Sequence, residues 1–292
     1  MSGAAVMEDV YAAIEKTAGL LNVPCSRDKV WPILMGFGPF EGGIIFSTST
    51  GAHAGDLDLT IQVASGIDDP YAHAVSKGFL PETDHPVGEL LADIEKQCTV
   101  NEYLIDCGVV GGLNKIYVHF PRDLQTVPAL AEIPSMPRAL GENAGFFARH
   151  GLENVTMIAI DYRRRTMNPY FTFPTGIDPE TIRSMLREIG VPEPEEEFLE
   201  SSGKSFRVYT TFSWDSPRIE RISFARRLDR PVITPRVEPE ITRFLTGSPY
   251  TYDGERFSIQ MIKWSPDEQW FSAGSYYQFG PLQWEVLKNI LR

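Results

Sequence analysis

The sequence predicts an α+β protein built around a single antiparallel β-barrel of about ten strands, ringed by helices. Three observations predict it: an αα-ββ order that repeats, short turns within each strand pair, and strands with one apolar and one polar face. The unit recurs about five times at a spacing of about 50–60 residues, without a low-complexity linker. We therefore expect residues 1–292 to form a single domain with its site in the barrel lumen.

Each repeat begins with helical periodicity and ends with strand-like alternation. Expected helices cover residues 6–22, 26–37, 70–79, 87–97, 127–134, 137–149, 178–189, 194–201, 238–247 and 280–291. Expected strands cover residues 42–50, 57–65, 101–108, 114–121, 154–162, 167–173, 204–213, 217–226, 256–264 and 269–279. Turn residues, such as those at 215–217 and 265–267, join the strands of a pair, so each pair is an antiparallel hairpin.

Alternation along the strands separates the two faces of the sheet. Residues 57–63 read Leu, Asp, Leu, Thr, Ile, Gln, Val, and residues 115–120 read Lys, Ile, Tyr, Val, His, Phe. The amphipathic helices have to bury their apolar stripes, and the apolar sheet face is the available partner. The polar face then lines a lumen, which in a ten-stranded barrel is wide enough to hold a ligand.

Composition and charge exclude several classes of partner. With 39 acidic and 27 basic residues the net charge is -12, which repels nucleic acid and anionic membranes. No apolar run approaches ~18 residues, and the N-terminus lacks the pattern of a signal peptide. Cys25, Cys98 and Cys107 have no metal-ligand spacing and are typical of reduced thiols. The reduced thiols lead us to expect a cytoplasmic protein. We expect a monomer, because helices already cover the sheet.

The motifs of common enzyme classes are absent from the sequence. Gly203-Lys204-Ser205 lacks the upstream glycine of a P-loop, and no dinucleotide-binding, zinc-protease or serine-hydrolase motif occurs. The five histidines form no metal-ligand spacing. Asp68-Asp69 lacks the further aspartate of an Asp-rich magnesium motif, so we expect it to cap the helix that starts at Pro70.

The side chains expected to face the lumen are basic and aromatic, with Asp58 as the only clear carboxylate. They are Lys115, Arg164, Arg207 and Arg221 with Tyr117, Tyr170, Tyr209 and Tyr276. Any single arginine is equally well explained by a salt bridge, but four cations on one face favour a small polyanion. Diphosphate matches both their charge and the fork geometry of arginine. The tyrosine rings can shield a cation with their negative faces.

Several segments resemble a known family. They are GDLDLTIQV, DDPYAHAVSKGFLPETDHPV, GGLNKIYVHFP, IPSMPRALGENAGFFARHGL and DYRRRTMNPYF. With the αα-ββ repeat, they resemble the soluble bacterial aromatic prenyltransferases of the ABBA, or PT-barrel, family, specifically its phenol, naphthalene and phenazine branch, from about Val10 to Leu287. The resemblance implies transfer of a dimethylallyl or geranyl group from its diphosphate to an electron-rich aromatic small molecule in secondary metabolism.

The resemblance also implies roles for individual residues. Catalytic roles fall on Lys115, Tyr117 and Arg221, and diphosphate contacts on Lys115, Arg164, Asn168, Tyr209 and Arg221. The prenyl and acceptor pocket is implied at Thr60, Tyr117, Thr156, Met157, Tyr170, Phe206, Arg207, Ala225, Tyr276 and Gln283. Asp58 matches the carboxylate that holds Mg²⁺ in members that use it, and whether Mg²⁺ is needed here stays open. Phe206 conflicts with the alternation, which puts it on the outer face unless a bulge intervenes.

Three positions depart from the family pattern. Ser272 stands where the Mg²⁺-using type has a diphosphate-binding lysine, Thr156 where a glutamine lines the acceptor pocket, and Arg207 where a serine contacts the acceptor. Arg207 therefore either reaches the diphosphate or pairs with an acidic acceptor. The implied mechanism is ionisation of the allylic diphosphate and attack by a ring carbon, for which no residue is an obvious general base.

Two other functions share features of this sequence. A non-catalytic barrel for a hydrophobic or phosphorylated metabolite has the same lumen and cations, but it binds without releasing diphosphate. A phosphatase acting on prenyl diphosphates needs a water-activating acid/base pair, which a single Asp58 does not supply.

Overall fold

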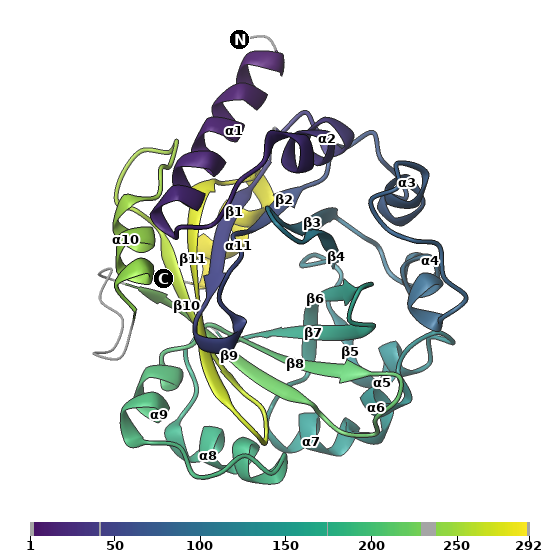
Figure 1. Ribbon diagram of the computed structural model, residues 1–292. Helices are drawn as coiled ribbons and strands as arrows, with labels where there is room; N and C mark the ends of the chain where they lie inside the picture. The colour runs from purple at the N-terminus through teal and green to yellow at the C-terminus, as the bar shows by residue number, and fades with distance from the viewer. Residues whose placement is uncertain (1–2, 41, 174, 229–237, 291–292) are drawn as a thin grey trace.

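Ten strands close into an antiparallel barrel in the computed structural model, which describes residues 3–40, 42–173, 175–228 and 238–290. The strand order is β4-β3-β2-β1-β11-β10-β9-β8-β7-β6, and the pairing of β6 with β4 closes the barrel. The predicted barrel is therefore confirmed (Figure 1). Its strands are β1 Ile44–Ser49, β2 Asp58–Gln62, β3 Glu102–Gly108, β4 Gly112–His119, β6 Asn154–Asp161, β7 Thr166–Thr172, β8 Arg207–Ser213, β9 Arg221–Leu228, β10 Ser258–Trp264 and β11 Gln269–Gln278, with the two-residue β5 Gln125–Thr126 beside β6.

Helices surround the barrel (Figure 1). They are α1 Gly3–Leu20, α2 Arg27–Phe37, α3 Pro70–Ser76, α4 Leu90–Glu95, α5 Val127–Ala131, α6 Arg138–Glu142, α7 Ala144–Arg149, α8 Pro179–Glu188, α9 Glu196–Gly203, α10 Pro239–Gly247 and α11 Pro281–Ile290, with short 3₁₀ turns η1 Gly51–His53 and η2 Pro86–Gly88. The last residue of the helix expected over 280–291 lies outside the described residues.

Local chemistry explains where two helices begin or break. Asp69 caps α3 as predicted, because its carboxylate accepts a hydrogen bond from the Ala72 amide at 2.8 Å and Pro70 occupies the first turn. The helix expected over 137–149 is instead two helices that meet at Asn143. The Asn143 side-chain amide donates to the carbonyls of Ala139 and Pro217, at 2.7 and 2.9 Å, and so ties the break to the β8–β9 turn.

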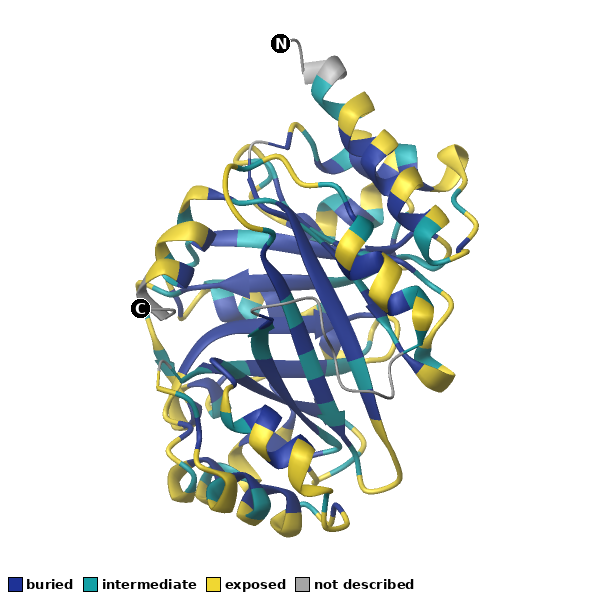
Figure 2. Cartoon of the chain, turned by 90° about the vertical axis from the view of Figure 1, so that its left-hand side faces the viewer, coloured by how far each residue is buried: buried dark blue, intermediate teal, exposed yellow. Residues whose placement is uncertain are grey.

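The apolar core lies between the outer face of the sheet and the helices. Leu59 on β2, Ile116 on β4 and Phe224 on β9 belong to one buried cluster with helix residues such as Leu34 and Phe244. Figure 2 shows largely buried strands and helices whose exposed side faces away from the barrel. The apolar side chains of the strands point outward and pack against the helices. Since side chains alternate along a strand, the polar and aromatic ones point inward.

Register shifts decide which side chains reach the interior. Between β6 and β7, Val155 pairs with Phe171 but Met157 pairs with Tyr170, so Thr156 is an extra residue. Val155 consequently packs in the outer core, while Met157 turns into the lumen.

No described helix is long and apolar enough to cross a membrane. Cys25, Cys98 and Cys107 are free, and Cys98 and Cys107 are buried.

Replacement of a large side chain in the outer core tests its contribution to stability. Phe224 is fully buried and packs edge-on against Trp264, with ring centroids 5.5 Å apart. We expect Phe224→Ala to lower the free energy of unfolding by about 3–5 kcal/mol, measured by urea denaturation. The control Val110→Ala, at a turn residue that is 40% exposed, should change it by at most about 0.5 kcal/mol. Equal effects of the two changes would contradict this account of the core.

Candidate active site in the barrel lumen

The lumen holds a cavity with ≈ 1200 Å³ of unfilled space, part of it open to solvent. Strands from all around the barrel line it, and α11 contributes Gln283, Val286 and Leu287. The predicted site residues that line it are Asp58, Thr60, Lys115, Tyr117, Met157, Asn168, Tyr170, Phe206, Arg207, Tyr209, Arg221, Ala225, Tyr276 and Gln283. The barrel therefore brings together most of the residues expected to form the site.

Two predicted site residues lie elsewhere. Arg164 is exposed in the turn between β6 and β7, where its backbone N–H donates to Asp161 Oδ1 at 2.8 Å. Alternation does not extend through this turn, because Arg165 has a φ of 53° and reverses the chain. Thr156 is the extra residue of the β6 bulge, and its hydroxyl donates to the Tyr170 carbonyl at 3.3 Å. Both placements correct the prediction that these side chains face the lumen.

Phe206 lines the lumen although strict alternation puts it on the outer face. The strand β8 begins only at Arg207, and both Phe206 and Arg207 reach the cavity. Phe206 packs in a small cluster with Phe257, Tyr276 and Leu287. The alternation was wrong at this position because Phe206 precedes the regular strand.

One part of the lumen gathers positive charge. Lys115 on β4, Arg221 on β9 and Lys263 on β10 all line the cavity. Burial holds the pKa of Lys263 well below its usual value, and the positive charges of Arg221 and Lys115 lower it further. The Nε atoms of Arg207 and Arg221 are buried and have no hydrogen-bond partner among the described residues. Such cations favour an anionic ligand, because it would supply the missing counter-charge.

Sequence reasoning missed Lys263, and it also missed a second carboxylate. Asp106 on β3 is 5% exposed and lines the lumen, so Asp58 is not the only acid on a strand interior. Tyr117 donates its hydroxyl hydrogen to Asp106 Oδ2 at 2.9 Å, and Lys115 Nζ lies 3.7 Å from the same oxygen. Strand alternation applied to all of 102–108 would have placed Asp106 on the same face as Glu102 and Leu104.

The two lumen carboxylates interact electrostatically. Burial raises the pKa of Asp58 to about 7, and the negative charge of Asp106 is the next cause. The pKa of Lys115 is raised: burial acts to lower it, but the carboxylates of Asp106, Asp161 and Asp58 raise it more. Lys115 is therefore a permanently charged group, whereas Asp58 can exchange a proton near neutral pH.

Tyrosine rings line the wall beside this charged region. Tyr170 stacks on Tyr209 with ring centroids 4.5 Å apart, and Tyr117 meets Tyr170 edge-on at 6.2 Å. The Arg207 guanidinium lies 6.0 Å from the Tyr170 ring centroid. Asn168 is held beside them because its amide donates to Thr211 Oγ1 at 2.9 Å. The rings present negative faces that can stabilise a transient cation.

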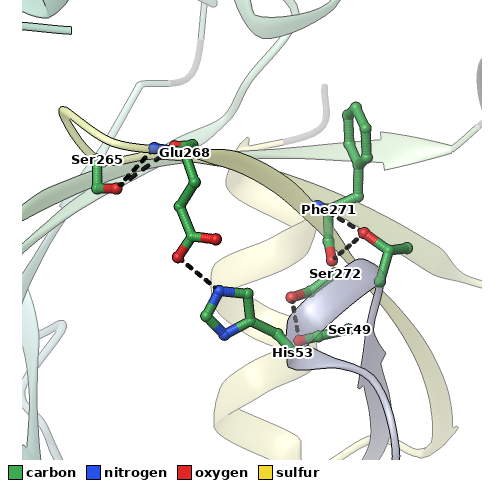
Figure 3. A network of polar contacts seen from close by, with 7 residues as sticks. Ser49, His53, Ser265, Glu268, Phe271 and Ser272 are labelled. Atoms are coloured by element: carbon green, nitrogen blue, oxygen red, sulfur yellow. Dashed lines mark hydrogen bonds and ion pairs between the residues drawn. The ribbon is translucent and has the colours of Figure 1, made fainter.

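A polar network ties two turns together at one rim of the barrel (Figure 3). His53 Nε2, in η1, lies 2.8 Å from Glu268 Oε1, and the hydroxyls of Ser49 and Ser272 are 2.7 Å apart. The His53 ring stacks on Trp270, and the Arg221 guanidinium lies 5.5 Å from the Trp270 ring centroid. The network thus fixes the aromatic ring against which Arg221 rests.

Comparison with known proteins places the chain in a family. The sequence model of the family described as aromatic prenyltransferase Orf2 matches residues 6–284. The chain belongs to this aromatic prenyltransferase family. The resemblance inferred from the sequence segments is thereby confirmed.

Three bacterial members of the family show extensive similarity. The chain is 41% identical to a flaviolin linalyltransferase of Streptomyces virginiae, over 96% of this chain and 95% of that protein. It is 40% identical to a furaquinocin biosynthesis prenyltransferase of Streptomyces sp. (strain KO-3988), over 92% and 90%. It is 37% identical to a 5,10-dihydrophenazine-1-carboxylate 9-dimethylallyltransferase of Streptomyces anulatus, over 96% of each chain.

The coupling between the two carboxylates can be measured directly. Replacing Asp106 with asparagine removes a negative charge near Asp58, so the pKa of Asp58 should fall from about 7 toward its ordinary 3.8. Carboxyl ¹³C NMR over a pH titration would report it. Because the folded-state pKa is raised, the stabilising contribution of protonated Asp58 is full below pH 3.8 and is lost as pH rises through about 7. In Asp106→Asn this loss should end at a lower pH.

A matched control for this titration is Asp93→Asn, which removes a carboxylate on α4 that pairs with Lys96. It should leave the Asp58 titration unchanged. An Asp58 curve that is the same in wild type and in Asp106→Asn would show that the two carboxylates do not interact.

Proposed function

We propose that this enzyme transfers a dimethylallyl or geranyl group from its diphosphate to an electron-rich aromatic small molecule and releases diphosphate. The observation that carries the proposal is a lumen in which Lys115, Arg221 and Lys263 gather beside stacked tyrosines. The cations suit the leaving group, and the aromatic wall suits an allylic cation and a flat acceptor.

The leaving diphosphate would be bound by the cationic part of the lumen. Negative charge develops on it as the allylic C–O bond breaks, and groups already in place stabilise that charge without reorganisation. Lys115, Arg221 and Lys263 supply the charge, while Asn168 and Tyr209 supply neutral donors. Arg164, by contrast, is exposed in its turn and is not assigned to this site.

The two lumen carboxylates would also serve as ligands for a metal ion. Mg²⁺ in enzymes is often bound by one or two carboxylates together with substrate phosphates, and Asp58 and Asp106 fit that donor set. Within the described ranges no three His, Cys, Asp or Glu side chains gather as metal ligands, so the diphosphate and water would complete the coordination. A bound Mg²⁺ would neutralise diphosphate charge, a task that Lys263 and Arg221 also serve.

The prenyl chain and the acceptor would occupy the aromatic part of the lumen. Tyr117, Tyr170 and Tyr209 would shield the allylic cation from water. Phe206, Tyr276, Met157 and Gln283 would hold the flat ring. We place Arg207 at the acceptor, where its guanidinium would favour an acidic or phenolic ring, because it lies beside Phe206, with 5.5 Å to the ring centroid.

We propose further that the chain acts as a single-domain cytoplasmic monomer. The continuous barrel supports one domain, since all the strands that the structure describes belong to one sheet. The free thiols support a reducing compartment.

The deciding assay is diphosphate release from dimethylallyl and geranyl diphosphate, with and without an acceptor. Hydroxynaphthalenes, phenazine carboxylates and hydroxybenzoates form the acceptor panel, tested with Mg²⁺ and with EDTA. Acceptor-dependent release, together with a product heavier by one prenyl unit, is the expected result. Tight donor binding without release across the panel would instead support a non-catalytic binding protein.

Removal of a lumen cation should slow turnover without unfolding the barrel. We expect Lys115→Ala and Arg221→Ala each to lower kcat by about 10²–10³-fold, because each loses stabilisation of the leaving group. Arg164→Ala, which changes an exposed arginine, should retain turnover. Circular dichroism would verify folding. Near-normal kcat in both lumen variants would remove these residues from the leaving-group role.

A further inference from the structure

A buried histidine–glutamate pair lies on the lumen side of β3 and β4. His119 Nδ1 is 2.7 Å from Glu102 Oε1, and each side chain is only 5% exposed. The two residues stand directly opposite each other in the β3–β4 register. An ionised carboxylate can only accept, so Nδ1 carries the hydrogen and donates it to Glu102. In the neutral ring the lone pair is then on Nε2.

Each residue of this pair has one buried atom without a hydrogen-bond partner among the described residues, Oε2 of Glu102 and Nε2 of His119, and only His119 lines the lumen cavity, so its Nε2 is the atom of interest. It is buried and has no hydrogen-bond partner among the described residues, although buried polar atoms normally have one. His119 lines the same cavity as Lys115 and Tyr117. An unpartnered ring nitrogen on a residue that lines a substrate-sized cavity points to a ligand that would complete its hydrogen bonding.

The position of His119 along β4 indicates which part of the ligand it meets. Lys115, Tyr117 and His119 face the lumen in succession, so His119 lies about 13 Å along the strand from the diphosphate-binding Lys115. Its neighbour across the β4–β6 register is Met157, which we place at the acceptor. A base at this distance faces a substituent of the acceptor ring and not the ring carbon that meets the allylic group.

We infer that His119 is the base that takes the proton of a hydroxyl group on the aromatic acceptor, with Glu102 as its positioning residue. The inference rests on the proposed function and adds a base that the leaving-group site does not supply. It also narrows the substrate class to hydroxylated aromatic rings, in which loss of the hydroxyl proton makes the ring carbons more nucleophilic.

Deprotonation of the acceptor hydroxyl comes first. The O–H electrons stay on oxygen, and the proton moves to Nε2, giving an imidazolium that Glu102 stabilises. A ring carbon of the phenolate then forms the C–C bond as the allylic C–O bond breaks and diphosphate leaves, which gives a neutral ring ketone. Water or the diphosphate takes the proton from that ring carbon, the electron pair restores the aromatic ring, and His119 returns its proton to oxygen. One proton and one diphosphate are released in total.

Other titratable groups lie on the strands beside the pair and on α11. Tyr117 and Lys115 follow on β4, Asp106 lies on β3, and Tyr170 lies on β7. Glu285 of α11 is paired with Arg122 at 2.7 Å, and Lys288 is on the same helix. Met157, the partner of His119 on β6, does not titrate. The test therefore varies the acidity of the acceptor as well as the pH.

The experiment compares kcat for naphthols of graded acidity, at saturating donor, in wild type, His119→Gln and Glu102→Gln. On weakly acidic naphthols His119→Gln should lose on the order of 10²–10⁴-fold in kcat. The loss should shrink as the naphthol becomes more acidic or as pH approaches the hydroxyl pKa, because the hydroxyl then ionises unaided. Glu102→Gln should show a smaller loss with the same dependence.

The matched control is His150→Gln. His150 also pairs with a glutamate, with Nε2 3.0 Å from Glu188 Oε2, and its side chain is 6% exposed, but it lies at the end of α7 and is absent from the lumen lining. It should react like wild type with every naphthol.

Two results would overturn the inference. A loss in His119→Gln that is the same for all naphthols and at every pH would show a structural role, and unchanged rates would show no role. If His119→Gln fails to fold by circular dichroism, Glu102→Gln is judged by the same dependence on acidity. Failure of the proposed function itself is distinguishable, because wild type would then show no acceptor-dependent diphosphate release.

Discussion

Desolvated positive charge in the lumen is the feature on which the rest of the site depends. Burial holds the pKa of Lys263 well below its usual value, and the positive charges of Arg221 and Lys115 lower it further, because the energy of burying these cations together is unfavourable. The carboxylates of Asp58 and Asp106 offset part of that energy. A diphosphate would offset more, which supports our proposal that the lumen binds the group whose departure the reaction requires.

The outer core supplies the stability that allows the lumen to hold buried charges. Apolar strand faces and helices form a continuous buried cluster outside the sheet, so stability does not depend on filling the lumen with apolar side chains. The rim network also positions Trp270, and the Arg221 guanidinium lies against the ring of this residue. His53 stacks on this ring from one turn while Arg221 rests against it from the lumen (Figure 3 shows His53 with Glu268).

Much of this architecture could be predicted because strand alternation is a local property. It placed Asp58 and Lys115 inside the barrel and Leu59 and Ile116 outside it. It failed in the turn that carries Arg164, and the bulge at Thr156 likewise displaced a residue that the family resemblance had implied in the pocket. A single extra residue reverses the face of every side chain beyond it, and sequence alone does not locate such a residue.

Other residues were missed because their significance depends on neighbours that are distant in the sequence. Lys263 shares the lumen face of β10 with Ile259 and Met261, and these two apolar residues make that face look apolar in the sequence. Glu102 and His119 are 17 residues apart, and only the β3–β4 register makes them a hydrogen-bonded pair. Cross-strand partners of this kind require the register, which is set by the turns and bulges of the folded chain.

The most direct test of the central claim is proton uptake when inorganic diphosphate binds. Calorimetric titrations at pH about 9, in buffers of different ionisation enthalpy, would measure it. A bound polyanion should raise the depressed pKa of Lys263, so wild type should take up protons and Lys263→Met should take up fewer. Binding without proton uptake, or equal uptake in both proteins, would contradict the claim that the desolvated lumen cations form the binding site for the diphosphate.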